Sequence, residues 1–238
     1  MNIKKTLKII AGVIIFFTLP SLLFFGFLYF KYNEDLPIGI PGEQADALAH
    51  KMLLALDHKA YQETNYLEWT FKRRHHYKWQ KDEKKCMVQF EDYKVNLDLN
   101  DYTKSKVYVH SFEVQGDKQK ELLKKAIDYF NNDSFWLVAP YKVFDNGVKR
   151  SLVRQPNGEH ALLVTYTSGG STPGDSYLWL LEESGKPRAY KMWTSILPID
   201  GLEASWSDWT TTESGAQLPT FHKLLFLGLE MGDVKGTK

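Results

Sequence analysis

The hydrophobic and polar positions divide the chain into an uncharged N-terminal block, a short helical stretch and a long region of alternating pattern. Residues 9–30 contain no charged side chain. As a helix, this block rises about 33 Å at 1.5 Å per residue. That length crosses a hydrocarbon core of about 30 Å, so the block predicts a transmembrane helix.

Residues 34–42 read as a short linker, because two prolines and two glycines prevent regular structure. From Glu43 to about Ala60 the apolar positions recur every three or four residues, which predicts an amphipathic helix. A second helix is predicted over 117–131, ended by the polar run Asn131–Ser134. The buried positions expected on these two helices are Leu48, Met52, Leu56, Leu123, Ile127 and Phe130.

Elsewhere the apolar positions alternate with period 2, and Asn-Gly and Ser-Gly pairs supply hairpin turns. The predicted fold class is therefore α+β, mainly β: a curved antiparallel half-barrel sheet wrapped around about two helices. We divide the chain into a tip and anchor (1–33), a linker (34–42) and a β-rich domain (43–238). The predicted strands cover 66–71, 76–79, 86–90, 93–99, 107–112, 135–138, 148–153, 161–166, 176–182, 188–195, 202–209 and 224–229.

Charge and cysteine content narrow the function classes. The net charge is +1, and without the three lysines ahead of the apolar block the rest carries 27 basic and 29 acidic residues, or −2. A basic face for nucleic acid is not expected from this balance. The single cysteine, Cys86, excludes an internal disulfide, a zinc finger and an iron–sulfur cluster, and a buried structural thiol is expected. No cofactor or metal is predicted.

The apolar block has two interpretations. A cleaved signal peptide has a shorter apolar region and a small-residue cleavage site, neither of which is present, so a retained anchor is favoured. Lys4, Lys5 and Lys8 place the N-terminus in the cytoplasm by the positive-inside rule. We therefore expect a single-pass inner-membrane protein, held in the bilayer by residues 9–30, with its domain in the periplasm or outside the cell.

Several strands are apolar on both faces, notably Tyr177–Leu181 and Ala189–Trp193, so something covers the second face. One explanation is that helices pack on one side of these strands and the curled sheet packs on the other. The other explanation is that part of the aromatic side chains line a cavity for an apolar ligand, and the two are compatible. The candidate cavity residues are Trp69, Phe71, Trp79, Phe90, Trp136, Trp179 and Trp193.

The sequence patterns that could indicate catalysis or metal binding are less specific than the apolar pattern. The Gly170–Gly174 run matches neither a nucleophile elbow nor a phosphate loop, and is interpreted as a turn. His75 and His76 point to opposite faces of a strand, so one metal ion does not use both, and a solvated basic hairpin is expected. Glu203 and Asp208 also face opposite sides, at edge positions in water.

One resemblance rests on the second half of the chain. After the second helix come Asp133-Ser-Phe-Trp-Leu-Val-Ala-Pro-Tyr-Lys142, Asp145-Asn-Gly-Val148 and Thr172-Pro-Gly-Asp175, ahead of an aromatic strand ending at Gly185. This order resembles the LolA-like outer-membrane lipoprotein-sorting superfamily, over roughly 117–190. The resemblance implies an incomplete antiparallel barrel enclosing helices, with an apolar cavity that binds lipid or lipoprotein acyl chains without catalysis.

The functional prediction is thus a membrane-anchored, non-catalytic module that binds an apolar ligand, a lipid or lipoprotein acyl chain. Two alternatives remain open: an envelope hydrolase, and a structural scaffold that meets other envelope proteins. The soluble carriers of the LolA-like superfamily lose their signal peptide, whereas this chain is expected to keep its anchor.

Overall fold

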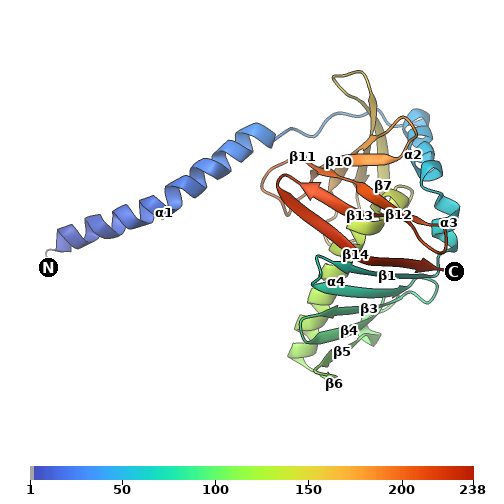
Figure 1. Cartoon of the computed structure of the whole chain (residues 1–238), viewed down its shortest axis with the longest axis horizontal. Coiled ribbons are helices and arrows are strands. Elements are labelled where there is room, and N and C mark those ends of the chain that lie inside the picture. The colour runs from blue at the N-terminus through green and yellow to red at the C-terminus, as the bar shows by residue number, and fades with distance from the viewer. Residues whose placement is uncertain (1–2) are drawn as a thin grey trace.

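The computed structural model describes residues 3–238, so the first two residues of the predicted cytoplasmic tip lie outside it. Figure 1 shows the long helix α1 (Ile3–Tyr32) projecting from a β-rich body. The body contains the helices α2 (Glu43–Ala55), α3 (His58–Glu63) and α4 (Asp117–Val138). Short 3-10 turns cover Tyr102–Lys104 and Ala139–Lys142.

The strands fall into two groups on either side of α4 in the sequence. Before α4 come β1 (Tyr66–Phe71), β2 (His75–Gln80), β3 (Lys85–Phe90), β4 (Tyr93–Asp98), β5 (Lys106–Val109) and β6 (Phe112–Glu113). After α4 come β7 (Val148–Arg154), β8 (His160–Tyr166), β9 (Ser176–Leu181), β10 (Pro187–Trp193), β11 (Leu202–Ser205), β12 (Ser207–Thr211), β13 (Gln217–Leu224) and β14 (Leu227–Thr237).

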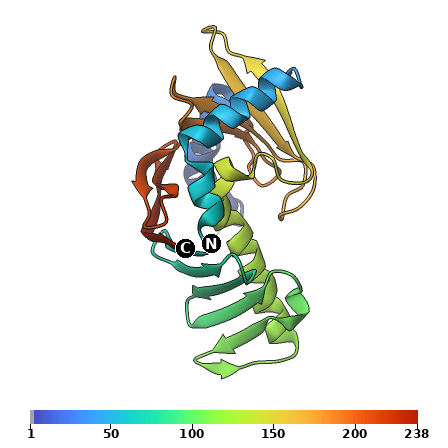
Figure 2. The same cartoon turned by 90° about the vertical axis from the view of Figure 1, so that its right-hand side faces the viewer.

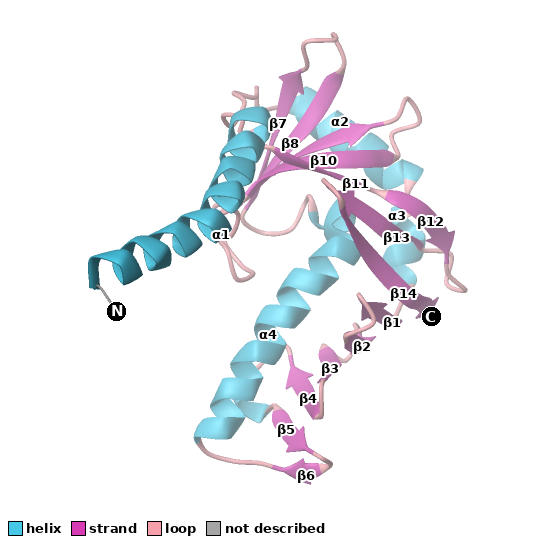
Figure 3. Ribbon diagram, turned by 60° about the vertical axis from the view of Figure 1, so that its left-hand side comes forward, coloured by secondary structure: helices cyan, strands magenta, loops and turns pink. Residues whose placement is uncertain are grey.

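All of these described strands form one antiparallel sheet. Its order is β6-β5-β4-β3-β2-β1-β14-β13-β11-β10-β9-β8-β7, with β12 paired to β13. The last strand, β14, joins the two groups by pairing with β1 on one side and β13 on the other. The strands β6 and β7 are the two edge strands and do not pair with each other, so the curved sheet stays open (Figure 3). The predicted α+β, mainly β class with an open antiparallel sheet is confirmed.

The inner face of the sheet is built by the period-2 alternation. Along β1, Leu67, Trp69 and Phe71 point inward, and their cross-strand partners continue the apolar row. The helix α4 lies along this face, as Figure 2 shows. On its side toward the sheet Leu122, Ala126 and Phe130 are buried at positions four residues apart. One core cluster therefore connects α2, α4 and both groups of strands.

The predicted end of the second helix is wrong. We expected Asn131–Ser134 to end it and 135–138 to form a strand, whereas α4 continues to Val138. The polar run does not stop the helix because Asp133 and Ser134 are themselves buried, and Asp133 is hydrogen-bonded by strand β2. Tertiary contacts here override the local preference of these residues for helix ends.

Several other boundaries also differ from the prediction. The predicted strand 107–112 contains a hairpin turn at His110 and Ser111, which have positive φ, and the strand β13 was not predicted. The helix predicted from Glu43 to Ala60 is divided after Ala55 into α2 and α3. At the break Asp57 adopts a φ of 50°, and its side chain caps α3 by accepting from the Ala60 N–H. The predicted strand 202–209 is split into β11 and β12. The predicted strand 224–229 contains a hairpin turn, where Leu225 has a φ of 54°. That turn carries no glycine or asparagine, so the sequence does not signal it.

A second, smaller apolar cluster lies on the outer face of β7–β10. Its residues are buried, and the segment between α1 and α2 contacts both ends of the cluster. Trp193 Nε1 donates to the Glu34 carbonyl at 2.8 Å, and Ile40 forms an antiparallel bridge with Leu152 of the edge strand β7. At Gly39 an added Cβ would come within 2.6 Å of the Ser151 Cβ, so only glycine allows this close approach.

The helix α1 is long and apolar enough to cross a membrane over Thr6–Tyr32, and none of its most apolar window is buried in the protein. The residues that follow its C-terminal end are hydrogen-bonded to the body. The Glu34 N–H donates to the Asp200 carbonyl at 3.0 Å, and the Asp200 N–H donates to Asn33 Oδ1 at 3.0 Å. Lys191 Nζ forms an ion pair with Glu34 at 2.6 Å. The direction in which α1 leaves the body is therefore defined by these bonds.

Candidate functional site

The seven aromatic residues predicted to line a cavity occupy three places in the structure. Four of them lie on the inner face of β1–β3, where Trp79 packs edge-on against Phe130 of α4 with 5.2 Å between ring centroids. Trp179 lies on the inner face of β9, and Trp136 lies on the helix α4 rather than on the predicted strand; both contact Tyr190. Trp193 belongs to the cluster on the outer face. Six of the seven thus belong to the inner core or pack against it.

Their exposure distinguishes filled interior from accessible surface. Trp69 and Trp179 have no exposed surface, so these two rings adjoin no space that holds a water molecule, and Phe90 is only 2% exposed. Trp79 and Trp136 are half-buried. A ligand that meets this interior without displacing side chains therefore meets Trp79 or Trp136 first. The role of the seven residues in ligand binding stays a prediction.

The aromatic interior between α4 and the strands after it is a network of edge-on rings. The Trp179 ring lies 4.9 Å from that of Trp206, and Trp206 lies 4.5 Å from His222. His222 in turn lies 5.1 Å from Trp136, which closes the network against α4. Sequence reasoning missed Trp206 and His222. The inward period of β13, which carries Leu218 and His222 on one face, is the signal for His222.

Polar atoms in this interior lack partners. The indole N–H groups of Trp69, Trp179 and Trp206 are buried without a hydrogen bond, and so is Nε2 of His222. The other ring nitrogen of His222, Nδ1, donates to the Ser205 carbonyl at 2.9 Å. An unpaired buried donor or acceptor costs about 1–3 kcal/mol. These ring nitrogens are therefore neither hydrated nor hydrogen-bonded, and their surroundings are apolar.

Burial gives His222 a titration that differs between the folded and unfolded chain. Loss of solvation lowers the pKa of His222 to about 4, while an ordinary histidine titrates near 6.5. As the pH falls through 6.5 the unfolded chain takes up a proton that the folded chain does not. The stabilisation is therefore complete above pH 6.5 and is lost progressively as the pH falls to about 4.

Acidification from pH 7.5 to pH 5 is therefore expected to lower the free energy of unfolding by about 2 kcal/mol through His222 alone. The measurement is urea unfolding of the full chain and of the His222→Gln variant at both pH values. The other histidines are the same in both proteins, so the difference between the two pH dependences isolates His222. Equal pH dependences would contradict the assignment.

A buried polar cluster joins α4 to the sheet. The Asp133 side chain is 1% exposed, and its Oδ2 accepts from the Tyr77 hydroxyl at 2.5 Å and from His75 Nδ1 at 2.7 Å. Its Oδ1 accepts from Asn132 Nδ2 at 2.8 Å. The His75 ring stacks on Tyr129 of α4 at 4.1 Å. Burial first, and the Asp133 carboxylate second, raise the pKa of Tyr77 far above its usual range, so the phenol stays protonated.

This cluster corrects the expectation of a solvated basic hairpin around residues 73–76. Arg73, Arg74 and His76 are exposed, but His75 turns inward to Asp133. The Asp133–His75 pair also resembles part of a catalytic triad, yet both hydrogen bonds on Oδ2 come from structural donors, and no serine or cysteine is hydrogen-bonded to His75 among the described residues. The cluster therefore connects α4 to the sheet through buried hydrogen bonds.

The remaining chemical candidates are Glu203, Asp208, Cys86 and the Ser168–Asp175 segment. Glu203 and Asp208 are exposed, as expected, and Cys86 is a buried free thiol whose pKa is raised by burial, the opposite of an activated nucleophile. The Ser168–Asp175 segment is a turn, closed by a Thr172 hydroxyl that donates to Asp175 at 2.6 Å. Within residues 3–238 no group of three histidine, cysteine or acidic side chains is placed to hold a metal ion.

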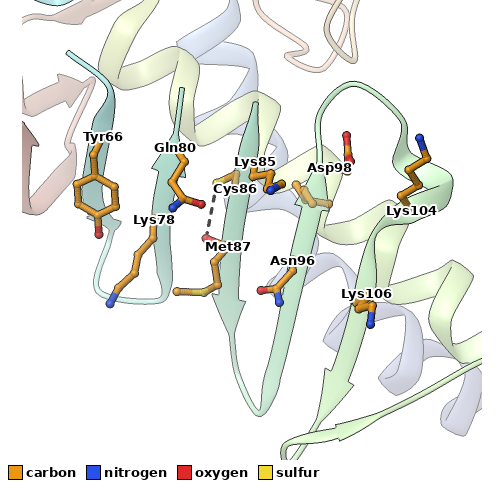
Figure 4. A pocket seen from close by; sticks show the side chains of 11 residues that line it. Tyr66, Lys78, Gln80, Lys85, Cys86, Met87, Asn96, Asp98, Lys104 and Lys106 are labelled. Carbon is orange, nitrogen blue, oxygen red and sulfur yellow. Dashed lines mark hydrogen bonds between the residues drawn. The ribbon is translucent and has the colours of Figure 1, made fainter. Parts of the chain in front are cut away.

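The outer face of β1–β5 carries an open groove of about 440 Å³, shown in Figure 4. Lysines line the groove, but three of them form ion pairs with neighbouring carboxylates. The pairs are Lys85 with Glu83 at 2.8 Å, Lys104 with Asp101 at 3.4 Å and Lys106 with Glu113 at 3.7 Å. These exposed pairs leave little uncompensated charge to attract an anion. The groove is therefore a solvated sheet face.

Comparison with solved structures gives a similar fold. No family model and no curated protein matches the sequence. The crystal structure of a DUF1329 family protein from Desulfovibrio piger ATCC 29098 is similar to this chain, with a TM-score of 0.44 and 12% sequence identity. The similarity covers 83% of this chain and 93% of that one.

Proposed function

We propose that this protein is a membrane-anchored, non-catalytic module that binds the acyl chain of a lipid or lipoprotein from the membrane it is anchored in. The anchor is α1, retained in an inner membrane, with the N-terminus in the cytoplasm and the body on the other side. The resemblance to the LolA-like superfamily supports this proposal, as does the open sheet curved around α4.

The observation that carries the proposal is that apolar side chains of the anchor and of the aromatic interior pack against one core cluster. Leu28 and Tyr32 of α1 pack against this cluster, and so does Leu224, the last residue of β13. Two residues back on the same face of β13 is His222, and the His222 ring lies 5.1 Å from Trp136. We infer that a chain leaving the bilayer beside α1 follows these side chains to Trp136.

The first point of contact is the half-buried Trp136, because Trp179 and Trp206 behind it are closed to solvent. Deeper binding requires α4 and β13 to separate. Each methylene that enters contributes about 0.8 kcal/mol, so a chain of about a dozen carbons offsets a substantial cost of opening. Binding should therefore strengthen with chain length and depend little on salt, since no ionic contact is needed.

Photo-crosslinking tests the proposal on the full chain in nanodiscs. A phospholipid with a diazirine near the end of its acyl chain is added in trace amount, and tryptic peptides are mapped after irradiation. Label is expected in the α4 peptide 126–142, which contains Trp136, in addition to the α1 peptide 9–31. Label confined to α1 overturns the proposal.

A matched pair of variants tests the route. Leu224→Glu places a charge on the inner face of β13, whereas Lys223→Glu places the same charge on the neighbouring exposed position. The first variant is expected to lose most of the label in peptide 126–142, and the second to keep it. Thermal unfolding of both variants shows whether the fold is kept.

The structural scaffold is the second candidate function, favoured by the complete burial of Trp69 and Trp179. It predicts a body that stays closed in the membrane. Peptide 126–142 would then remain unlabelled at every chain length, in the wild type as in both variants.

A further inference from the structure

The tip of the β13–β14 hairpin is apolar and exposed. Its four residues are Leu224, Leu225, Phe226 and Leu227, and the exposed fraction is 68% for Phe226 and 49% for Leu227. A two-residue hairpin turn normally carries asparagine or glycine, because positive φ is required there. Here Leu225 adopts a φ of 54°, which is unfavourable for a leucine. The turn thus accepts both backbone strain and exposed apolar surface.

The tip lies beside the anchor. The Phe226 and Phe24 ring centroids are 6.4 Å apart, and Figure 1 shows the hairpin tip on the side of the body that faces α1. A second exposed apolar side chain, Ile196 at 65%, is in the β10–β11 loop that also holds the end of α1 through Asp200. These apolar positions therefore gather around the point where α1 meets the body.

The contact with Phe24 sets the depth of the tip. Phe24 precedes Tyr32 by eight residues, which is about 12 Å along a helix. Tyr29, Lys31 and Tyr32 at the end of α1 are residues that prefer the membrane interface. Phe24 then lies below the interface, among the acyl chains, and a side chain that touches it is at the same depth.

We propose that the β13–β14 hairpin tip is immersed in the outer leaflet of the bilayer that α1 spans, so that the body is docked on the membrane at two points. The tip residues Phe226 and Leu227 contact acyl chains, and Ile196 contacts the interface. The exposed Lys223, one residue before the tip on β13, extends its ammonium toward the lipid headgroups. The bonds of Asn33 and Glu34 to the body fix this orientation. This docking does not depend on the proposed acyl-chain binding.

Depth-dependent fluorescence quenching tests the docking. The full chain is made as a Phe226→Cys variant, labelled with an environment-sensitive fluorophore and reconstituted in phosphatidylcholine–phosphatidylglycerol liposomes. Cys86 is 1% exposed and does not compete for the label. The matched control is Lys238→Cys, one residue beyond the other end of β14, about 35 Å from the tip at 3.3 Å per residue.

With nitroxide attached to the acyl chains, emission from position 226 is expected to fall severalfold, while emission from position 238 is unchanged. Aqueous iodide should give the reverse order. Quenching of position 226 by iodide as strongly as position 238 overturns the docking, and so does shielding from both quenchers, which would mean that Phe226 packs on α1 alone. A Leu227→Cys variant repeats the test if Phe226 proves necessary for folding.

The two proposals fail separately in these experiments. Nitroxide quenching at the tip together with an unlabelled peptide 126–142 leaves the docking intact and removes acyl-chain binding. Label in peptide 126–142 with a solvated tip gives the opposite result.

Discussion

Replacing Asp133 with alanine is expected to lower the free energy of unfolding by about 3–5 kcal/mol. The substitution leaves the Tyr77 hydroxyl buried without its acceptor and removes the partner of His75, which joins α4 to the sheet. Urea unfolding of the full chain in detergent measures this, with tryptophan fluorescence as the signal because α1 stays helical in the micelle.

The control for this prediction is Asp128→Ala on the same helix. Asp128 forms an exposed ion pair with Lys124 at 2.7 Å, and such pairs contribute little, so a change below about 0.5 kcal/mol is expected. Tyr77→Phe removes one donor from the cluster and should cost about 1 kcal/mol. If Asp133→Ala and Asp128→Ala are equally stable, the cluster does not hold α4 in place.

The second large effect is expected at Leu53. Leu53 of α2 belongs to the inner core and is 4% exposed, whereas the adjacent Leu54 is 81% exposed. Leu53→Ala should cost about 3 kcal/mol from lost transfer energy and the cavity left behind. Leu54→Ala should change stability by less than about 0.5 kcal/mol.

These neighbouring leucines make a matched pair, because both substitutions remove the same atoms from the same helix and change helix propensity alike. The difference between the two free energies of unfolding therefore measures burial alone. A difference below about 1 kcal/mol would mean that α2 does not pack on the sheet as the structure has it.

The strand pattern was predicted well because the sheet has one consistent inner face. Where Leu67, Trp69 and Phe71 point inward, their cross-strand partners on β2 also do, so a period of 2 appears in the strands that have one solvated face. Errors occurred where a local signal was outweighed or absent. Asp133 looks like a helix terminator until Tyr77 and His75 supply its hydrogen bonds.

The candidate site was only partly predictable for a related reason. Alternation within one strand shows that two side chains share a face, but not which face covers the core when both are apolar. Trp179 and Trp193 both lie on strands with apolar residues on both faces, yet Trp179 joins the inner core and Trp193 the outer cluster. The linker that closes the outer cluster has no apolar period, so its packing on Trp193 left no signal.

The sequence by itself determined the elements whose cause is local: the apolar helix, the amphipathic helices and the alternating strands. The period of the hydrophobic positions and the length of an apolar block are properties of one segment, so they can be recognised in the sequence without knowledge of the fold. The tertiary structure alone decided what depends on residues far apart in the chain. It placed β14 between β1 and β13, brought His222 onto Trp136 and set Phe226 beside Phe24. Such contacts are selected by the packing of the whole core, which no single segment encodes.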